Sequence, residues 1–184
     1  MKSIFIAFSS IALACLVALS GCNSSNQAEN QQASSPADAT SASHYQASLA
    51  LNGAPLISAN GQSIVVTVNV TNTGSGTFGS TTTPNNVNLA AHGVDATGKI
   101  VDQDLARGHL PQVTAGATAT AIILLPVDRV LGKGAEILPV QENVAWFDKW
   151  GTKPIQVGPF ETCGDAATSK VCDSNGKPLP IAAQ

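Results

Sequence analysis

QSIVVTVNVTN, residues 62–72, is the clearest folding signal in this chain of 184 residues. Every second position carries a branched aliphatic side chain: Ile64, Val66, Val68 and Val70. Successive side chains of a β-strand point to opposite faces, so one face of this segment is apolar and the other is mixed with Thr and Asn. The segment predicts a strand that packs one face on a core, and Thr73-Gly74-Ser75-Gly76 ends it.

Similar segments lie on both sides of this strand. We expect further strands at residues 45–51, 87–94, 99–103, 117–127, 135–144 and 153–157. The turn Asp95-Ala96-Thr97-Gly98 joins the strands at 87–94 and 99–103 into a hairpin, because Gly adopts the positive φ that such turns need. About seven strands without long helical periodicity predict an all-β fold, an antiparallel β-sandwich.

Composition narrows the class of protein. Charged residues make up 11% of the chain and the formal net charge is −3. No cluster of Lys and Arg is present to neutralise phosphates, so we expect no nucleic-acid partner. The abundance of Gly, Thr, Ser, Asn and Val favours strands and turns over helices.

The first 22 residues have the pattern of an export signal. Lys2 precedes an apolar run from Ile4 to Leu19, which is too short for a comfortable membrane span. The following Leu19-Ser20-Gly21-Cys22 resembles the lipobox of bacterial lipoprotein precursors. The resemblance implies that the Cys22 thiol takes a diacylglycerol and that fatty acids such as palmitate hold the protein to a membrane. The alternative is a plain signal helix or one-pass anchor in which Cys22 is incidental.

The residues after Cys22 predict a tether. Residues 23–43 contain no aromatic side chain and no aliphatic side chain larger than Ala, so they cannot form a core and should be disordered. By the lipoprotein resemblance, Asn23 in place of the aspartate of inner-membrane lipoproteins favours the outer membrane, facing the periplasm or the cell surface. We therefore expect a signal peptide at 1–21, a lipidated linker at 22–43, a sandwich at 44–160 and a tail at 161–184.

The four cysteines divide by position. Cys15 lies within the signal and Cys22 takes the lipid, which leaves Cys163 and Cys172 in an oxidising compartment. We expect these two to form a disulfide that staples the tail. A metal site is the alternative, but His44, His92 and His109 are distant in sequence, so we expect no metal and no cofactor.

Several segments in this order carry a second resemblance. They are Val68-Asn69-Val70-Thr71-Asn72-Thr73-Gly74, Asp95-Ala96-Thr97-Gly98, Leu110-Pro111 with Val113 and Ala115-Gly116, and Val144-Ala145-Trp146-Phe147 with Gly151. They resemble a family of bacterial immunoglobulin-like β-sandwich modules found at the cell surface or in proteins of glycosyl transfer and polysaccharide assembly. Over residues 63–157 the resemblance implies an immunoglobulin-like sandwich with a binding or assembly role.

Aromatic residues mark the first candidate site. Trp146, Phe147 and Trp150 include both tryptophans of the chain, and such rings stack on sugars while the neighbouring Asp148, Lys149 or Glu142 hydrogen-bond hydroxyl groups. Packing at the end of the sandwich is the alternative role for the cluster. If a single ring is exposed, we expect it to be Trp150.

A polar stretch marks the second candidate site. It contains His92, Asp95, Asp102, Asp104, Arg107 and His109. A small hydrolase would draw a base or metal ligands from it, but no nucleophile motif accompanies it, and solvated hairpin charges are the simpler interpretation. We therefore expect a non-catalytic, lipid-anchored envelope protein that binds a glycan or another envelope protein, with a carbohydrate-binding accessory of polysaccharide assembly as the alternative and a periplasmic hydrolase as the third.

Overall fold

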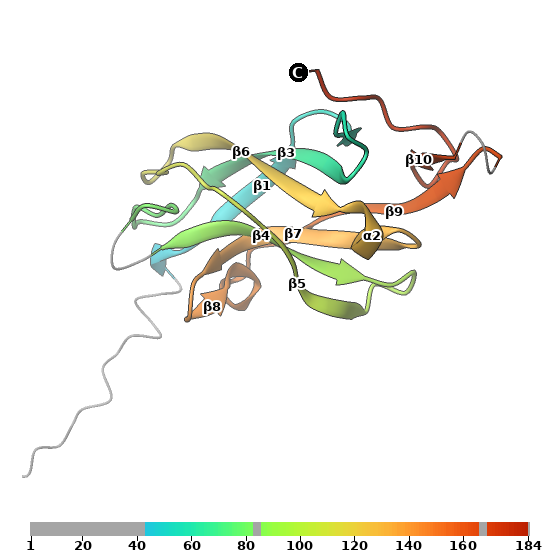
Figure 1. The fold of residues 1–184 in the computed structure, drawn as a ribbon. Helices are drawn as coiled ribbons and strands as arrows, with labels where there is room; N and C mark the ends of the chain where they lie inside the picture. Colours follow the sequence, from blue (N-terminus) through green and yellow to red (C-terminus); the bar gives the residue numbers. More distant parts are fainter. Residues whose placement is uncertain (1–42, 83–85, 166–168, 184) are drawn as a thin grey trace, which may run out of the picture. The chain divides into compact units, whose positions relative to one another are not determined.

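The computed structural model describes residues 43–82, 86–165 and 169–183 (Figure 1). The expected signal peptide, Cys22 and the linker up to residue 42 lie outside the described residues. Among the described residues, no helix is long and apolar enough to cross a bilayer.

Two antiparallel sheets pack against each other (Figure 1). The smaller sheet contains β1 (Ala47–Leu51), β2 (Leu56–Ile57), β3 (Ser63–Asn72) and β6 (Thr118–Pro126). The larger sheet contains β4 (Val87–Val94), β5 (Ile100–Gly108), β7 (Lys133–Gln141), β8 (Ala145–Trp146), β9 (Ile155–Cys163) and β10 (Lys170–Cys172). The short helices α2 (Val127–Val130) and η1 (Phe147–Trp150) connect strands. The predicted all-β, immunoglobulin-like sandwich is confirmed.

The chain crosses repeatedly between the two sheets. In the smaller sheet β3 lies between β6 on one side and both β1 and β2 on the other, and the larger sheet has the order β10-β9-β7-β4-β5 with β8 beside β7. Consecutive strands β3 and β4, and again β5 and β6, lie in opposite sheets. This arrangement brings distant segments together, so a surface on one sheet draws its residues from several parts of the sequence.

The core forms between the inner faces of the sheets. The alternating residues Ile64, Val66, Val68 and Val70 of β3 are all buried in it, as predicted. They pack with inward side chains of the facing strands, among them Leu89 of β4 and Ile137 of β7. Each such side chain contributes about 1.5 to 3 kcal/mol when it is fully buried.

The predicted hairpin is present between β4 and β5. The Asp95 N–H donates to the Lys99 carbonyl over 3.0 Å, and Gly98 has a φ of 81° that favours Gly. The strand bounds at 45–51, 62–72, 87–94 and 117–127 agree with β1, β3, β4 and β6 within two residues.

Other strand bounds were wrong. β5 continues to Gly108 instead of ending at Gln103, because it is an edge strand whose outward residues are polar and show no apolar alternation. β7 begins at Lys133 and ends at Gln141, earlier than the predicted 135–144. β9 continues through Gly158-Pro159 to Cys163, beyond the predicted end at residue 157. The Gly158–Pro159 peptide is cis, and an irregular register between β7 and β9 accommodates the proline.

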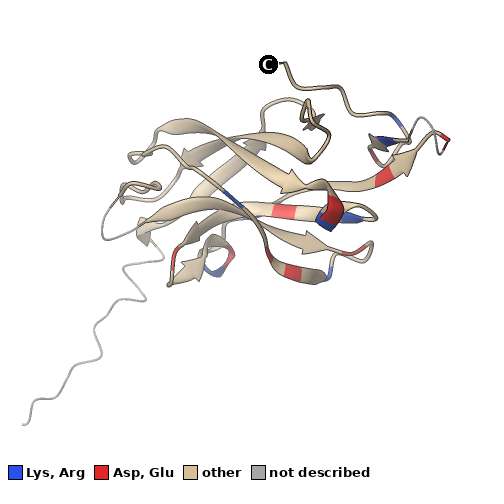
Figure 2. Cartoon of the chain, viewed as in Figure 1, with Lys and Arg blue, Asp and Glu red and all other residues tan. Residues whose placement is uncertain are grey.

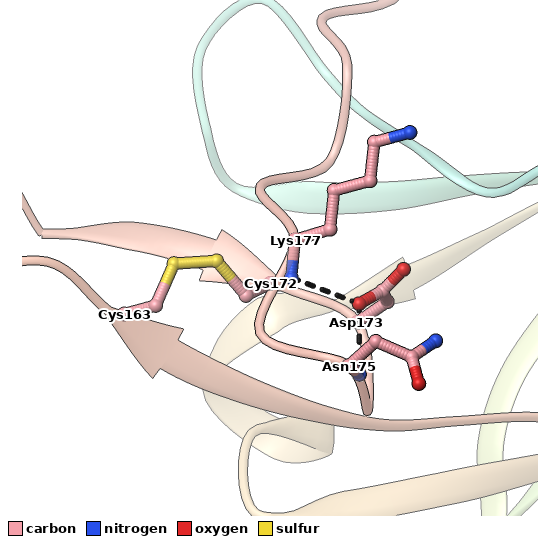
Figure 3. The surroundings of a disulfide bond; sticks show 5 residues. All are labelled: Cys163, Cys172, Asp173, Asn175 and Lys177. Carbon is pink, nitrogen blue, oxygen red and sulfur yellow. Dashed lines mark hydrogen bonds between the residues drawn. A yellow bond between two sulfur atoms is a disulfide. The ribbon is translucent and has the colours of Figure 1, made fainter.

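The predicted disulfide between Cys163 and Cys172 is confirmed (Figure 3). Their Cα atoms are 5.9 Å apart, where β9 ends and β10 pairs with it. The larger sheet therefore continues beyond residue 160, into the segment 161–184 that the sequence analysis assigned to the tail.

Charge is distributed unequally over the two sheets. The strands of the smaller sheet contain no Asp, Glu, Lys or Arg, whereas β5, β7, β9 and β10 all do (Figure 2). A site for a polar ligand is therefore best sought on the larger sheet.

Candidate functional site

The segment from Ala145 to Trp150 places its aromatic residues on different sides of the larger sheet. In β8, Trp146 lies directly opposite Val140 of β7. The next residue, Phe147, points the other way, as strand geometry requires, and is fully buried in the core. The helix η1 then ends at Gly151, whose φ of 88° favours Gly.

Phe147 and Trp150 belong to an aromatic cluster at one end of the sandwich. The Phe147 ring centroid lies 5.3 Å from that of Phe78, 6.0 Å from Tyr45 and 5.2 Å from Trp150. The Trp150 ring is half-buried against the core and lies 5.5 Å from Tyr45. Burial raises the pKa of the Tyr45 hydroxyl above its ordinary value. For Phe147 the structure gives a packing role, and a ligand cannot reach its ring.

Trp146 lies on the outer face of the larger sheet. Ala90, Leu138 and Val140 are buried there although they do not belong to the core between the sheets. In the pairing of β4 with β7, Asn88 lies opposite Val140, Ala90 opposite Leu138 and His92 opposite Glu136. The half-buried Trp146 indole begins opposite Val140 and reaches His92, with ring centroids 3.7 Å apart.

Arg107 of β5 also contacts the indole. Its Cζ atom lies 4.9 Å from the centroid of the Trp146 ring, within the range of a cation–π interaction. Its Nε donates to Glu142 Oε1 over 3.2 Å, and a second guanidinium nitrogen pairs with Asp104. One cation therefore faces two carboxylates, and the Asp104 side chain is 70% exposed while those of Arg107 and Glu142 are partly exposed.

A chain of hydrogen bonds fixes Glu142 in turn. Asn88 Nδ2 donates to Glu142 Oε1 over 2.7 Å, Ser80 Oγ donates to Asn88 Oδ1 over 2.5 Å, and the Leu110 N–H donates to Ser80 Oγ over 2.7 Å. These residues come from three loops and the strand β4. The carboxylate is therefore held in place by the protein's own groups.

A hydrogen bond to β5 also fixes the His92 ring. Its Nδ1 lies 2.7 Å from the Gln103 carbonyl oxygen. A carbonyl oxygen only accepts hydrogen bonds, so Nδ1 carries the proton and the ring is locked against β5. We call Ser80, Asn88, His92, Asp104, Arg107, Glu142 and Trp146 the outer-face cluster.

The structure thus joins parts of both sequence-predicted candidate sites. Trp146 comes from the aromatic site, while His92, Asp104 and Arg107 come from the polar stretch. The sequence analysis missed Ser80 and Asn88. Asn88 is a polar residue on the outward face of a predicted strand and Ser80 is a polar loop residue, and the sequence contains no other indication of their role. The contact between His92 and Trp146 depends on the pairing of β4 with β7, which no local pattern reveals.

The other members of the polar stretch lie outside the outer-face cluster, and Asp95 and Asp102 have structural partners. Asp102 forms an ion pair with Arg129 at 2.6 Å. The Asp95 carboxylate accepts bonds from Thr97 and Lys99 in its own turn, and the Thr97 hydroxyl bond above all lowers the Asp95 pKa. His109 is exposed just after β5. Among the described residues, no group of three or more His, Cys, Asp or Glu side chains is arranged to hold a metal ion.

Comparison with known proteins gives no relative: a scan against protein-family models found no match, and a search of curated proteins found none either.

Proposed function

We propose that this chain is a lipid-anchored protein of a bacterial cell envelope, and that its sandwich is a non-catalytic binding or assembly module. The observation that carries the anchor is Leu19-Ser20-Gly21-Cys22 directly after a short apolar segment. The Cys163–Cys172 disulfide supports an exported location, because such bonds persist in oxidising compartments. By the lipoprotein resemblance, Asn23 favours the outer membrane.

Mass spectrometry of the mature amino terminus tests the anchor. We expect a chain that begins at an acylated Cys22 and fractionates with membranes, and we expect Cys22→Ala to abolish acylation. Cys15→Ala is the matched control and should leave acylation unchanged. An unmodified Cys22 in a protein free in the periplasm would contradict the proposal.

The outer-face cluster supports a more specific role, the binding of a glycan of the cell envelope. An indole stacks on the CH-rich face of a sugar ring, and fixed polar groups beside it hydrogen-bond the hydroxyls. Trp146 offers a half-buried ring, and Arg107, Asp104 and Glu142 supply donors and acceptors next to it. This arrangement favours Trp146 over Trp150, whose ring packs against core aromatics.

A glycan array probed with the acyl-free Cys22→Ala chain tests this role. We expect Trp146→Ala to weaken binding about five- to tenfold, since a stacked ring contributes roughly 1 to 1.5 kcal/mol. Trp150→Ala is the control and should bind as before. Binding that survives Trp146→Ala, or an array without any bound glycan, would remove the carbohydrate assignment.

A further inference from the structure

Three loops of this chain contain the dipeptide Asn-Gly: Asn52-Gly53 between β1 and β2, Asn60-Gly61 between β2 and β3, and Asn175-Gly176 after β10. This dipeptide is chemically reactive, because Gly has no Cβ to shield its backbone nitrogen from the Asn side chain before it. All three asparagines are exposed to water. The dipeptide alone therefore ranks the three sites equally, and a difference between them has to come from the fold.

The reaction needs only these two residues and water. The backbone nitrogen of the Gly attacks Cγ of the Asn, so that an N–Cγ bond forms and the Cγ–Nδ2 bond breaks. Nδ2 leaves as ammonia, which takes the proton of the Gly N–H. Water then opens the resulting succinimide ring: addition at Cγ gives aspartate, and addition at the main-chain carbonyl gives isoaspartate, in which the chain runs through the side-chain carbon. Either product carries one more negative charge than asparagine.

The fold holds Asn60-Gly61 at both reacting groups. Asn60 Oδ1 accepts hydrogen bonds from Ser58 Oγ over 2.7 Å and from the Gln62 N–H over 3.1 Å, and Asn60 Nδ2 donates to Gln62 Oε1 over 3.2 Å. The Gly61 N–H donates to the Ser58 carbonyl over 2.8 Å. Attack on Cγ would have to break these bonds, so the fold protects this site.

The fold holds Asn175-Gly176 at one of the two groups. The Asp173 carboxylate accepts a hydrogen bond from the Asn175 N–H over 2.9 Å (Figure 3), and the Asp173 carbonyl accepts one from the Gly176 N–H over 2.9 Å. The attacking nitrogen is therefore engaged. The Asn175 carboxamide has no hydrogen bond to the residues that the structure describes, so this site has intermediate protection.

The fold holds Asn52-Gly53 at neither group. The Asn52 N–H donates to the Thr67 carbonyl over 2.8 Å, which extends the pairing of β1 with β3 by one residue. Within the described part of the chain, however, neither the Asn52 carboxamide nor the Gly53 N–H has a hydrogen bond. A Cβ placed on Gly53 would meet no atom within 4 Å, so the loop is open at this point.

We propose that Asn52 is a site of spontaneous modification, at which the folded chain converts asparagine to isoaspartate and aspartate before it does so at Asn175 or Asn60. Where a hydrogen bond has to open first, the reactive conformation is populated only as far as that bond opens, and one such bond lowers the rate about two- to tenfold. The conversion places a carboxylate at the end of β1, in the sheet whose strands contain no charged residue. The bond from the Asn52 N–H to Thr67 lies before the altered link, so the pairing of β1 with β3 should remain.

The test follows the three sites in the acyl-free Cys22→Ala chain at mildly alkaline pH, where loss of the Gly N–H proton is favoured. Peptide mapping of timed samples by mass spectrometry measures aspartate and isoaspartate at each site. We expect Asn52 to react about two- to tenfold faster than Asn175 and more than about tenfold faster than Asn60. In urea, where the fold is lost, the three rates should converge.

A variant with both Ser58→Ala and Gln62→Ala tests the protecting hydrogen bonds directly. It removes two side-chain partners of the Asn60 carboxamide, so Asn60 should react several-fold faster while the rate at Asn52 stays the same. Asn52→Gln should remove the first acidic form seen by isoelectric focusing, because Gln closes a larger ring more slowly. Faster reaction at Asn60 or Asn175 than at Asn52 in the folded chain would overturn the proposal, and so would folded-state rates that match those in urea.

Discussion

Trp146 and Phe147 are neighbours in the sequence, yet they belong to regions with different physical roles. Phe147 completes an aromatic cluster that excludes water from the end of the sandwich, whereas Trp146 lies on the outer face among ionised side chains. The first region contributes mainly stability, because its contacts remove apolar surface from water. The second combines polar groups with a half-buried aromatic ring, and it is the surface where we propose that a glycan binds. Neighbouring aromatic residues in a strand therefore should not be assigned one common role.

The largest effect should follow from substitution in the buried cluster. Phe147→Ala removes a fully buried ring that contacts Phe78, Tyr45 and Trp150. We expect the free energy of unfolding to fall by about 3 to 5 kcal/mol, measured by urea denaturation. A loss below about 1 kcal/mol would show that the cluster does not support the fold.

Trp146→Ala should have a smaller effect on stability. The indole lies on the outer face beside Val140 and His92 and is itself half-buried, so we expect the free energy of unfolding to fall by about 1 to 2 kcal/mol. Trp146→Phe keeps an aromatic ring at this position, so it should lower the free energy of unfolding by less than Trp146→Ala in the same denaturation experiment. If Trp146→Ala cost as much as Phe147→Ala, the division between a stabilising and a ligand-facing region would be wrong.

The inner faces of the sheets were predictable from the sequence, because strand alternation is a local pattern. Residues 62–72 and 87–94 show it, and β3 and β4 follow these bounds. The strands β2 and β8 contain two residues each, so they are too short to show an alternating pattern in the sequence. Without β8, the opposite directions of Trp146 and Phe147 could not be inferred.

Only some members of the outer-face cluster were predictable from the sequence, and their convergence was not. His92, Arg107 and Trp146 were each singled out as polar or aromatic residues of interest. Their convergence depends on two strand registers, Ala90 opposite Arg107 and Val140 opposite Trp146. Such pairings are set by how the sheets assemble, so the sequence pattern assigned these residues to two separate sites.

Alkaline titration distinguishes the two regions through Tyr45, the only tyrosine of the chain. Burial raises its pKa above the ordinary value of about 10, so in the folded chain the hydroxyl stays protonated where the unfolded chain has already ionised. The stability linked to this group is complete below pH 10 and falls as the pH rises above it. Absorbance of tyrosinate near 295 nm, a wavelength range characteristic of the ionised phenol, should show a higher midpoint in the native chain than in urea. Equal midpoints would mean that water reaches the cluster.

The smallest effect concerns the coupling between Arg107 and Trp146. The guanidinium lies over the indole but is partly exposed and also pairs with Glu142 and Asp104. Screening by solvent weakens such contacts, so a double-mutant cycle with Arg107→Gln and Trp146→Ala should give a coupling free energy of about 0.5 to 1 kcal/mol. The matched cycle of Arg107→Gln with Phe147→Ala should give a value near zero, because the Phe147 ring lies on the inner side of the same sheet. A coupling to Phe147 as large as that to Trp146 would mean that the two regions respond as one unit, and the sheet between them would not insulate the ligand-facing surface from the core.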